Sequence, residues 1–165
     1  MLAKSGHPVR VAKYCLGLYF SLALLATGGL AQTPTAPLYD ESADAHQAIS
    51  AAIVSAARTH KNIVLDFGAN WCFDCHVLDE QMRKPELASI VEKNFVVVHI
   101  DVGRMDKNTD LAAKYGVPLR RGIPALAVLD SKGKLLYAQD QGQFEDARHM
   151  SYEDIKAFFV KWKRD

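Results

Sequence analysis

Hydrophobic and polar positions follow two different patterns along the chain, and each pattern predicts one type of element. Between residues 43 and 60, apolar side chains recur every three or four positions, which predicts a helix over about these residues that Asn62 can end. The same spacing returns near the end of the chain, where Ser151 and Asp154 form a capping-box pattern at the start of a helix. The apolar positions of this last helix predict packing against a sheet, and they are Ile155, Phe158, Phe159 and Trp162.

Short apolar runs rich in strand-forming residues lie between the helical patterns. Residues 63–67 (IVLDF), 95–101 (FVVVHID) and 124–130 (PALAVLD) each predict a buried strand. The tight turn SKGK then predicts that residues 135–138 return as the second strand of a hairpin. Further helices are expected at residues 72–83, 86–93 and 110–115.

The predicted elements follow the order α-β-α-β-α-β-β-α. Parallel strands joined by helices, then a hairpin and a closing helix, predict an α/β fold with helices on both faces of a central sheet. Residues 32–42 (QTPTAPLYDES) are polar, contain two prolines and show no periodicity, so they are expected to form a linker. A single domain is therefore expected over residues 43–165.

The first 31 residues differ from the rest of the chain. Three basic residues precede an uncharged apolar run, YCLGLYFSLALLATGGLA, which ends in small residues. A positive start, an apolar stretch and a small-residue end are typical of a secretory signal peptide, and cleavage is expected after Ala31. The run at residues 14–31 is nearly long enough to span a bilayer, so an uncleaved membrane anchor is the alternative.

Composition and charge narrow the classes of function. Hydrophobic residues make up 49% of the chain and charged residues 24%, which is ordinary for a globular protein. Without the three basic residues of the leader, the chain has 17 Lys and Arg against 19 Asp and Glu, a formal net charge of −2. This charge, together with the lack of a basic patch interleaved with aromatic residues, argues against a nucleic-acid partner.

Removal of the leader also removes Cys15 and leaves two cysteines, Cys72 and Cys75, in the segment NWCFDCH. A disulfide between such near neighbours closes a tiny loop and stabilises a fold little, so redox chemistry explains the pair better. C-x-x-C between a strand and a helix is typical of thiol–disulfide exchange, whereas C-x-x-C-H, completed by His76, is typical of c-type haem attachment. A zinc site needs about four ligands, and no second C-x-x-C is present.

Two separate motifs resemble segments of the thioredoxin family. The run VLDFGANWCFDCH is similar to that family's active-site segment, with Asp66 in the strand and Trp71 before the first cysteine. The run KYGVPLRRGIPALAVLD resembles the family's second segment, which contains Ile123 and Pro124 here. The resemblance covers about residues 43–163 and includes the thioredoxin-like domain of the bacterial membrane disulfide reductase DsbD.

The resemblance implies a thioredoxin fold with a central mixed sheet, and a role for each site residue. Cys72 would be the nucleophile that forms a mixed disulfide with a partner, because the N–H groups at a helix N-terminus stabilise a thiolate. Cys75, one turn later, would attack back and release the partner. Asp66, a carboxylate inside a buried strand, would move the proton of Cys75. The substrate groove would be formed by Trp71, Ile123 and a cis Pro124.

The chain departs from the thioredoxin pattern at the two positions between the cysteines. Phe73 and Asp74 stand where thioredoxin itself has Gly-Pro, so both are candidates for tuning the reduction potential. Asp74 is expected to be an exposed carboxylate that disfavours the thiolate, which lowers the potential and favours a reductase. The buried lysine that accompanies the aspartate in this family is absent, and the second strand offers Val97 and His99 instead.

The sequence therefore predicts an exported, periplasmic thiol–disulfide oxidoreductase that reduces protein disulfides or relays electrons to them. No metal or organic cofactor is expected, but a reductase in an oxidising compartment needs electrons from outside, so a membrane electron donor is an expected partner. One alternative is a periplasmic disulfide oxidase or isomerase. Another is a non-catalytic module that binds partners through the Pro124 loop, and a third is a c-type haem protein.

Overall fold

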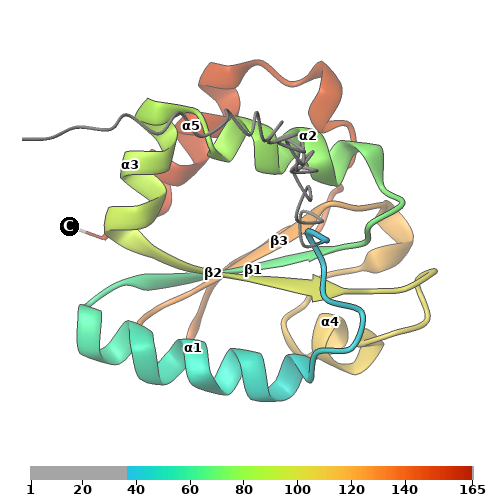
Figure 1. The fold of residues 1–165 in the computed structure, drawn as a ribbon, viewed down its shortest axis with the longest axis horizontal. Coiled ribbons are helices and arrows are strands. Elements are labelled where there is room, and N and C mark those ends of the chain that lie inside the picture. The colour runs from blue at the N-terminus through green and yellow to red at the C-terminus, as the bar shows by residue number, and fades with distance from the viewer. Residues whose placement is uncertain (1–36, 165) are drawn as a thin grey trace, which may run out of the picture. The chain divides into compact units, whose positions relative to one another are not determined.

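The computed structural model describes residues 37–164, so the predicted leader, Cys15 and the first part of the predicted linker lie outside the described residues. Within residues 37–164, no helix combines the length and the apolar character needed to cross a bilayer. The centre of the domain is a four-stranded sheet with the strand order β2-β1-β3-β4 (Figure 1). Its strands are β1 (Asn62–Gly68), β2 (Phe95–Asp101), β3 (Ala125–Leu129) and β4 (Leu135–Ala138).

The sheet is mixed, which confirms the fold class, but β3 does not run parallel to the first two strands. β1 and β2 are parallel, whereas β3 is antiparallel to both β1 and β4. At one edge of the sheet, Gly68 pairs with Asp101 and the adjacent Phe67 pairs with Ala125. The end of β2 and the start of β3 therefore lie at the same end of the sheet. Because the segment between them does not cross the sheet, β3 runs in the direction opposite to β1 and β2.

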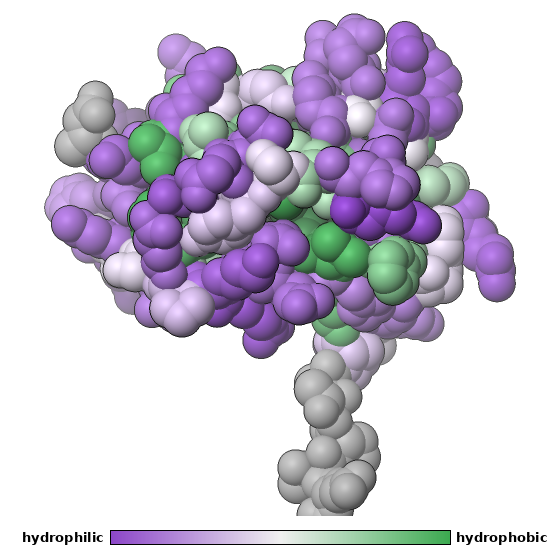
Figure 2. All heavy atoms as spheres, turned by 90° about the horizontal axis from the view of Figure 1, so that it is seen from above, coloured by the Kyte–Doolittle hydropathy of each residue, from purple (hydrophilic) through white to green (hydrophobic). Residues whose placement is uncertain are grey.

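Helices cover both faces of the sheet (Figure 1). On one face α1 packs together with the short α4, and on the other α2, α3 and α5 form a second layer. Figure 2 shows this second layer from outside, where hydrophilic side chains predominate and hydrophobic ones appear in smaller patches. The helices are α1 (Ala45–Thr59), α2 (Phe73–Met82), α3 (Pro85–Asn94), α4 (Thr109–Lys114) and α5 (Tyr152–Trp162), with short 3-10 segments η1 (Leu119–Arg121) and η2 (Ala147–His149).

The central strand β1 connects the two hydrophobic cores. All seven of its residues are buried, and successive side chains point to opposite faces. Leu65 packs with the core under α1, while Val64 packs with the core under α2, α3 and α5. The apolar stripe predicted for the last helix packs in this second core, since Ile155 and Phe159 are fully buried there.

The start of the last helix agrees with its prediction, whereas the end of the first helix differs from it. Ser151 is the N-cap of α5, and its hydroxyl accepts a hydrogen bond from the N–H of Asp154 at 3.1 Å, as predicted. The prediction that Asn62 ends the first helix is wrong, because α1 ends at Thr59 and His60 caps it with a left-handed backbone. Asn62 instead begins β1 and donates a hydrogen bond to the carbonyl of Trp162.

The segment before α1 packs against the domain. Tyr39 is fully buried, and its backbone N–H and C=O both bond to the side chain of Asn70, at 3.0 and 2.8 Å. Gly68 makes room for the Tyr39 ring, because a Cβ at that position would lie 2.1 Å from the tyrosine hydroxyl. The polar composition that predicts a linker up to residue 42 thus conceals one buried anchor, Tyr39.

Candidate active site

Cys72 and Cys75 lie where β1 ends and α2 begins, and they form a disulfide with Cα atoms 5.3 Å apart. Cys72 is the N-cap of α2, and its Sγ accepts a hydrogen bond from the N–H of Cys75 at 3.1 Å. Cys72 is 5% exposed and Cys75 only 1% exposed, so Cys72 is the sulfur that a partner reaches more easily. The same N–H group that faces Cys72 in the disulfide would stabilise a Cys72 thiolate after reduction.

The second predicted motif lies against the first. Ile123 is 51 positions from Cys72 in the sequence, yet its carbonyl oxygen lies 3.5 Å from the Cys72 Sγ. The peptide bond between Ile123 and Pro124 is cis. The carbonyl of Pro124 accepts a hydrogen bond from the buried side chain of Gln139 at 3.2 Å, and Gln139 also accepts from the N–H of Leu126. Gln139 thus braces this loop, and no sequence pattern indicates that role.

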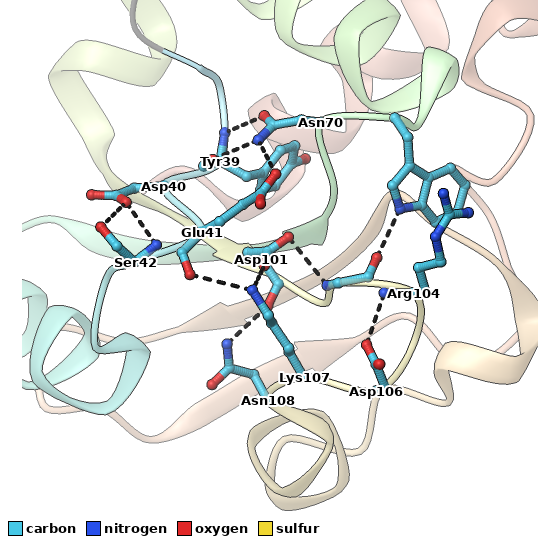
Figure 3. Close-up of polar contacts among 12 residues, drawn as sticks. Tyr39, Asp40, Glu41, Ser42, Asn70, Asp101, Arg104, Asp106, Lys107 and Asn108 are labelled. Atoms are coloured by element: carbon cyan, nitrogen blue, oxygen red, sulfur yellow. Dashed lines mark hydrogen bonds and ion pairs between the residues drawn. The ribbon is translucent and has the colours of Figure 1, made fainter.

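The loop that precedes Cys72 is held by polar contacts (Figure 3). The Asn70 side chain bonds to the backbone of Tyr39 and donates to Glu41 at 3.0 Å. The carbonyl of Asn70 accepts a hydrogen bond from His76 Nε2 at 2.8 Å. His76 therefore ties the first turn of α2 to its own loop, which accounts for this histidine without a haem.

Two exposed aromatic rings flank Cys72 in the sequence. Trp71 is 53% exposed and Phe73 is 62% exposed, although such side chains are more often buried. The Trp71 indole N–H donates to the carbonyl of Gly103 at 2.8 Å, which fixes the ring on the surface beside the disulfide. The Phe73 ring lies under the guanidinium of Arg148, 5.0 Å from its centroid.

The loop after β2, which binds the Trp71 indole, is itself held by polar contacts of Asp101 (Figure 3). Asp101 is buried and accepts hydrogen bonds from the N–H of Gly103 and from the Lys107 ammonium, both at 3.1 Å. The Asn108 amide donates to the Asp101 carbonyl at 2.8 Å. Since Gly103 carries the carbonyl that binds Trp71, this cluster sets the position of the indole. No motif in the sequence indicates that these residues belong to the site.

Asp66 is a buried carboxylate with an uneven set of partners. Its Oδ2 accepts hydrogen bonds from the Tyr39 hydroxyl and from His99 Nδ1, both at 2.8 Å. Its Oδ1 is buried and has no hydrogen-bond partner within residues 37–164. Burial and the charge of Asp66 raise the pKa of Tyr39, so the tyrosine hydroxyl stays protonated and donates.

His99 stands directly opposite Asp66 in the parallel pairing of β1 and β2. The sequence lacks the buried lysine that the resemblance leads one to expect beside Asp66. His99 is the basic partner of Asp66 in its place. Burial acts to lower the pKa of His99, but the hydrogen bond and charge of Asp66 outweigh it, so the pKa lies above its ordinary value of 6.5. The bonds of Asp66 within the described residues go to Tyr39 and His99, not to either cysteine.

The expectation that Asp74 is an exposed, uncompensated carboxylate is wrong. Asp74 is only 6% exposed, and its two oxygens accept four hydrogen bonds from Arg148, one from the backbone N–H and three from the guanidinium. These bonds, opposed by burial, hold the pKa of Asp74 below its ordinary value. Arg148 lies 74 positions away, in η2, so the sequence could not show that the carboxylate has a cation beside it.

The described part of the chain offers no cluster of three or more His, Cys, Asp or Glu side chains that could hold a metal ion. What the structure brings together is a disulfide at a helix N-terminus, two exposed aromatic rings and the loop of Ile123 and Pro124. This arrangement suits a reaction in which one sulfur is attacked by, or attacks, a partner that lies along the loop.

Comparison with known proteins gives a consistent result. The family model of thioredoxin-like proteins matches residues 44–131. The disulphide isomerase of Xylella fastidiosa Temecula1 is 44% identical, with a TM-score of 0.73, and the match covers 76% of this chain and 96% of that one. The oxidised C-terminal domain of Neisseria meningitidis DsbD is 23% identical over 74% of this chain and 97% of its own, with a TM-score of 0.51, and shows the fold alone. No curated protein matches the sequence.

Proposed function

Because the chain belongs to the thioredoxin-like family and is a thiol–disulfide oxidoreductase, we propose that it reduces disulfide bonds of partner proteins in the bacterial periplasm. The observation that carries the proposal is the position of Cys72, which caps α2 and also lies against the Ile123 carbonyl. A thiolate at this place has a helix N-terminus to stabilise it and a loop beside it that can align a substrate chain.

The reaction follows from the unequal burial of the two sulfurs. In the dithiol form, the Cys72 thiolate attacks one sulfur of the partner disulfide, which forms a mixed disulfide and releases the other sulfur as a thiolate. Cys75, which is buried one turn further along α2, then attacks Cys72 and releases the partner in its reduced form. In this proposal Asp66 accepts the proton of Cys75, and Trp71 and Phe73 offer apolar contact to the substrate.

The direction of electron flow is part of the proposal. The charge of Asp74, which favoured a low potential in the sequence analysis, is compensated by Arg148, so it supports a reductase less strongly than expected. A second candidate is a disulfide isomerase, because a relative with 44% identity carries that description. Reduction and isomerisation begin with the same attack by Cys72, so the residues keep the same roles in both.

Export and the electron source also belong to the proposal. The charge and apolar pattern of residues 1–31 support export, with the leader either cleaved or kept as an anchor. A reductase in an oxidising compartment is consumed in one turnover unless its disulfide is reduced again. A membrane protein that passes electrons outward would supply that step.

The test is the redox equilibrium of the Cys72–Cys75 pair in the full chain against glutathione. A potential near about −270 mV, as in thioredoxin, would support a reductase, and one near about −180 mV, as in protein disulfide isomerase, would favour the isomerase. A potential near about −120 mV, as in DsbA, would contradict both and indicate an oxidase.

A matched pair of variants tests whether the chemistry is the function at all. Cys75→Ser should accumulate mixed disulfides with partner proteins, because the resolving thiol is missing. Cys72→Ser should trap none and should fail to reduce insulin. If Cys72→Ser keeps the biological activity of the wild type, the chain is a binding module and the catalytic proposal is wrong.

A further inference from the structure

His99 is placed between the buried carboxylate and solvent. Its Nδ1 lies 2.8 Å from Asp66 Oδ2, and since a carboxylate oxygen only accepts, Nδ1 carries the proton. The other side of the ring is not sealed, because the side chain is 26% exposed and lines a surface hollow of about 160 Å³ between α2 and α3. A hollow of this size has room for water.

The hydrogen bonds to Asp66 are all on one oxygen. The Tyr39 hydroxyl and His99 Nδ1 both donate to Oδ2, whereas the buried Oδ1 has no partner in the described structure. A buried polar atom without a hydrogen bond is costly and rare in proteins, so its persistence calls for a role. In the disulfide form, two donors on Oδ2 hold the carboxylate plane and leave Oδ1 free to take up a proton.

We propose that His99 is a positioning residue that, together with Tyr39, orients Asp66 and then carries to solvent the proton that Asp66 receives from Cys75. This inference rests on the proposed function and assigns a route to the proton that Cys75 loses in the resolving step. The place of His99 beside Asp66 is fixed by the parallel register of β1 and β2. Tyr39 is fixed by Gly68, which leaves space for its ring.

The resolving step moves one proton and one electron pair. Asp66 takes the proton of the Cys75 thiol, and the Cys75 sulfur uses the freed electron pair to bond to Cys72. The bond between Cys72 and the partner sulfur breaks, and the partner leaves as a thiolate with the electron pair. A half-turn of the carboxyl group brings this proton to His99 Nδ1, which is free to accept it when neutral His99 holds its own proton on Nε2. His99 takes up the proton on Nδ1 and releases the Nε2 proton to water. Asp66 then regains its charge, and His99 carries the Nδ1 proton that it holds in the disulfide form.

This route predicts a pH dependence with a definite sign. Only neutral imidazole can accept a proton, so resolution should become faster as the pH rises through the pKa of His99. Burial acts to lower that pKa, but the Asp66 carboxylate holds it above 6.5, so the increase in rate should occur at a pH above the ordinary pKa of histidine. The titratable and charged groups around His99 are Asp66 on β1, Asp79 and Arg83 on α2, Glu92 on α3, and Tyr39 and Asp40 before α1.

The test uses the reduced full chain with glutathione disulfide as the probe. Cys72 becomes glutathionylated, and Cys75 then releases the glutathione. Acid quenching followed by mass spectrometry separates formation of the mixed disulfide, which depends on probe concentration, from its first-order decay. Both rates are measured from about pH 5 to about pH 9, on either side of histidine titration.

The decisive variant is His99→Gln, because glutamine keeps an N–H donor for Asp66 but cannot take up a proton. We expect its decay rate to fall about tenfold above the pKa of His99, less than the hundredfold or more typical of a direct acid–base group, and to lose the rise with pH. Formation of the mixed disulfide should change less than about twofold, since Cys72 acts before the proton moves. The control is His46→Gln, which removes a histidine paired with Asp110 at 3.0 Å on the exposed surface.

Three outcomes separate this inference from the proposed function. If the wild type never forms the mixed disulfide, the proposed function fails and the proton route fails with it. If the wild type reacts and His99→Gln keeps both the rate and the rise with pH, only the role of His99 is wrong. If His99→Gln does not fold, NMR titration of the wild type decides: the His99 midpoint should differ between the dithiol and disulfide forms. Equal His99 midpoints would overturn the route.

Discussion

Among single residues, Arg148 has the largest effect on how the site is interpreted. It donates four hydrogen bonds to Asp74 and also covers the Phe73 ring, so it touches both residues that stand between the cysteines. A carboxylate alone at this place would disfavour the Cys72 thiolate, and a guanidinium alone would favour it. The pair largely cancels, which leaves the helix N-terminus as the main stabilising influence on the thiolate.

Removal of either partner should therefore shift the reduction potential in opposite directions. Arg148→Gln leaves Asp74 uncompensated, disfavours the thiolate and should lower the potential. Asp74→Asn leaves the cation and should raise it. Because Arg148 is half exposed, we expect shifts of about 15–30 mV, where 30 mV corresponds to about 1.4 kcal/mol.

Glutathione equilibrium measures both variants, and Arg121→Gln serves as the control because it removes an exposed arginine outside the Asp74 contact. A shift of the same sign in Arg148→Gln and Asp74→Asn would mean that changes in packing, not charge, control the potential.

At the level of elements, the active-site loop depends on two segments that are distant in the sequence. Asn70 joins the loop to the segment before α1, and Trp71 joins it to the loop after β2 (Figure 3). A loop with its backbone held at both ends loses little entropy when a substrate binds, which is one requirement for a positioned nucleophile.

Asn70→Ala should weaken this attachment. The change removes three side-chain hydrogen bonds, those to the Tyr39 N–H and C=O and to Glu41, so we expect a loss of about 1–3 kcal/mol in the free energy of unfolding. Insulin reduction should also slow, because the Cys72 loop is less fixed.

Urea unfolding and the insulin assay measure the two effects of Asn70→Ala. The control is Asn94→Ala, which removes one local hydrogen bond to the carbonyl of Ile90 and should cost less. Equal losses in the two asparagine variants would show that Asn70 does not fix the loop.

On the scale of the whole molecule, the domain carries the redox chemistry and the sequence that precedes it carries the pattern that suggests export. The described residues form a sheet with two cores, and the reactive disulfide lies at the edge where β1 ends. The first 31 residues carry all the features from which export is inferred. Location bears on the function as well, because structural disulfides persist in oxidising compartments and are rare in reducing ones.

Expression of the full chain in a bacterium should place it in the periplasm. Cleavage after Ala31 would give a protein that begins at Gln32, which intact-mass spectrometry of the periplasmic fraction can detect. A full-length protein in the membrane fraction would instead indicate an anchor at residues 14–31. Recovery of the uncleaved protein from the cytosol would contradict export in either form.

The sequence by itself determined the elements, the fold class and the position of the reactive pair. An apolar run and a tight turn are local properties, so they predicted β2 and β4, respectively, with the bounds that the structure shows. The C-x-x-C spacing is local in the same sense, because a helix places residues three apart on one side. The resemblance to the thioredoxin family added the second motif, at Ile123 and Pro124.

Only the tertiary structure decided the electrostatics of the site. Tyr39 reaches Asp66 across 27 positions, His99 across 33, and Arg148 reaches Asp74 across 74. No periodicity records such pairs, because they arise from strand register and from loops that meet in space. The prediction that β3 runs parallel to β1 was wrong for the same reason, since an apolar run has the same pattern whichever way the strand runs.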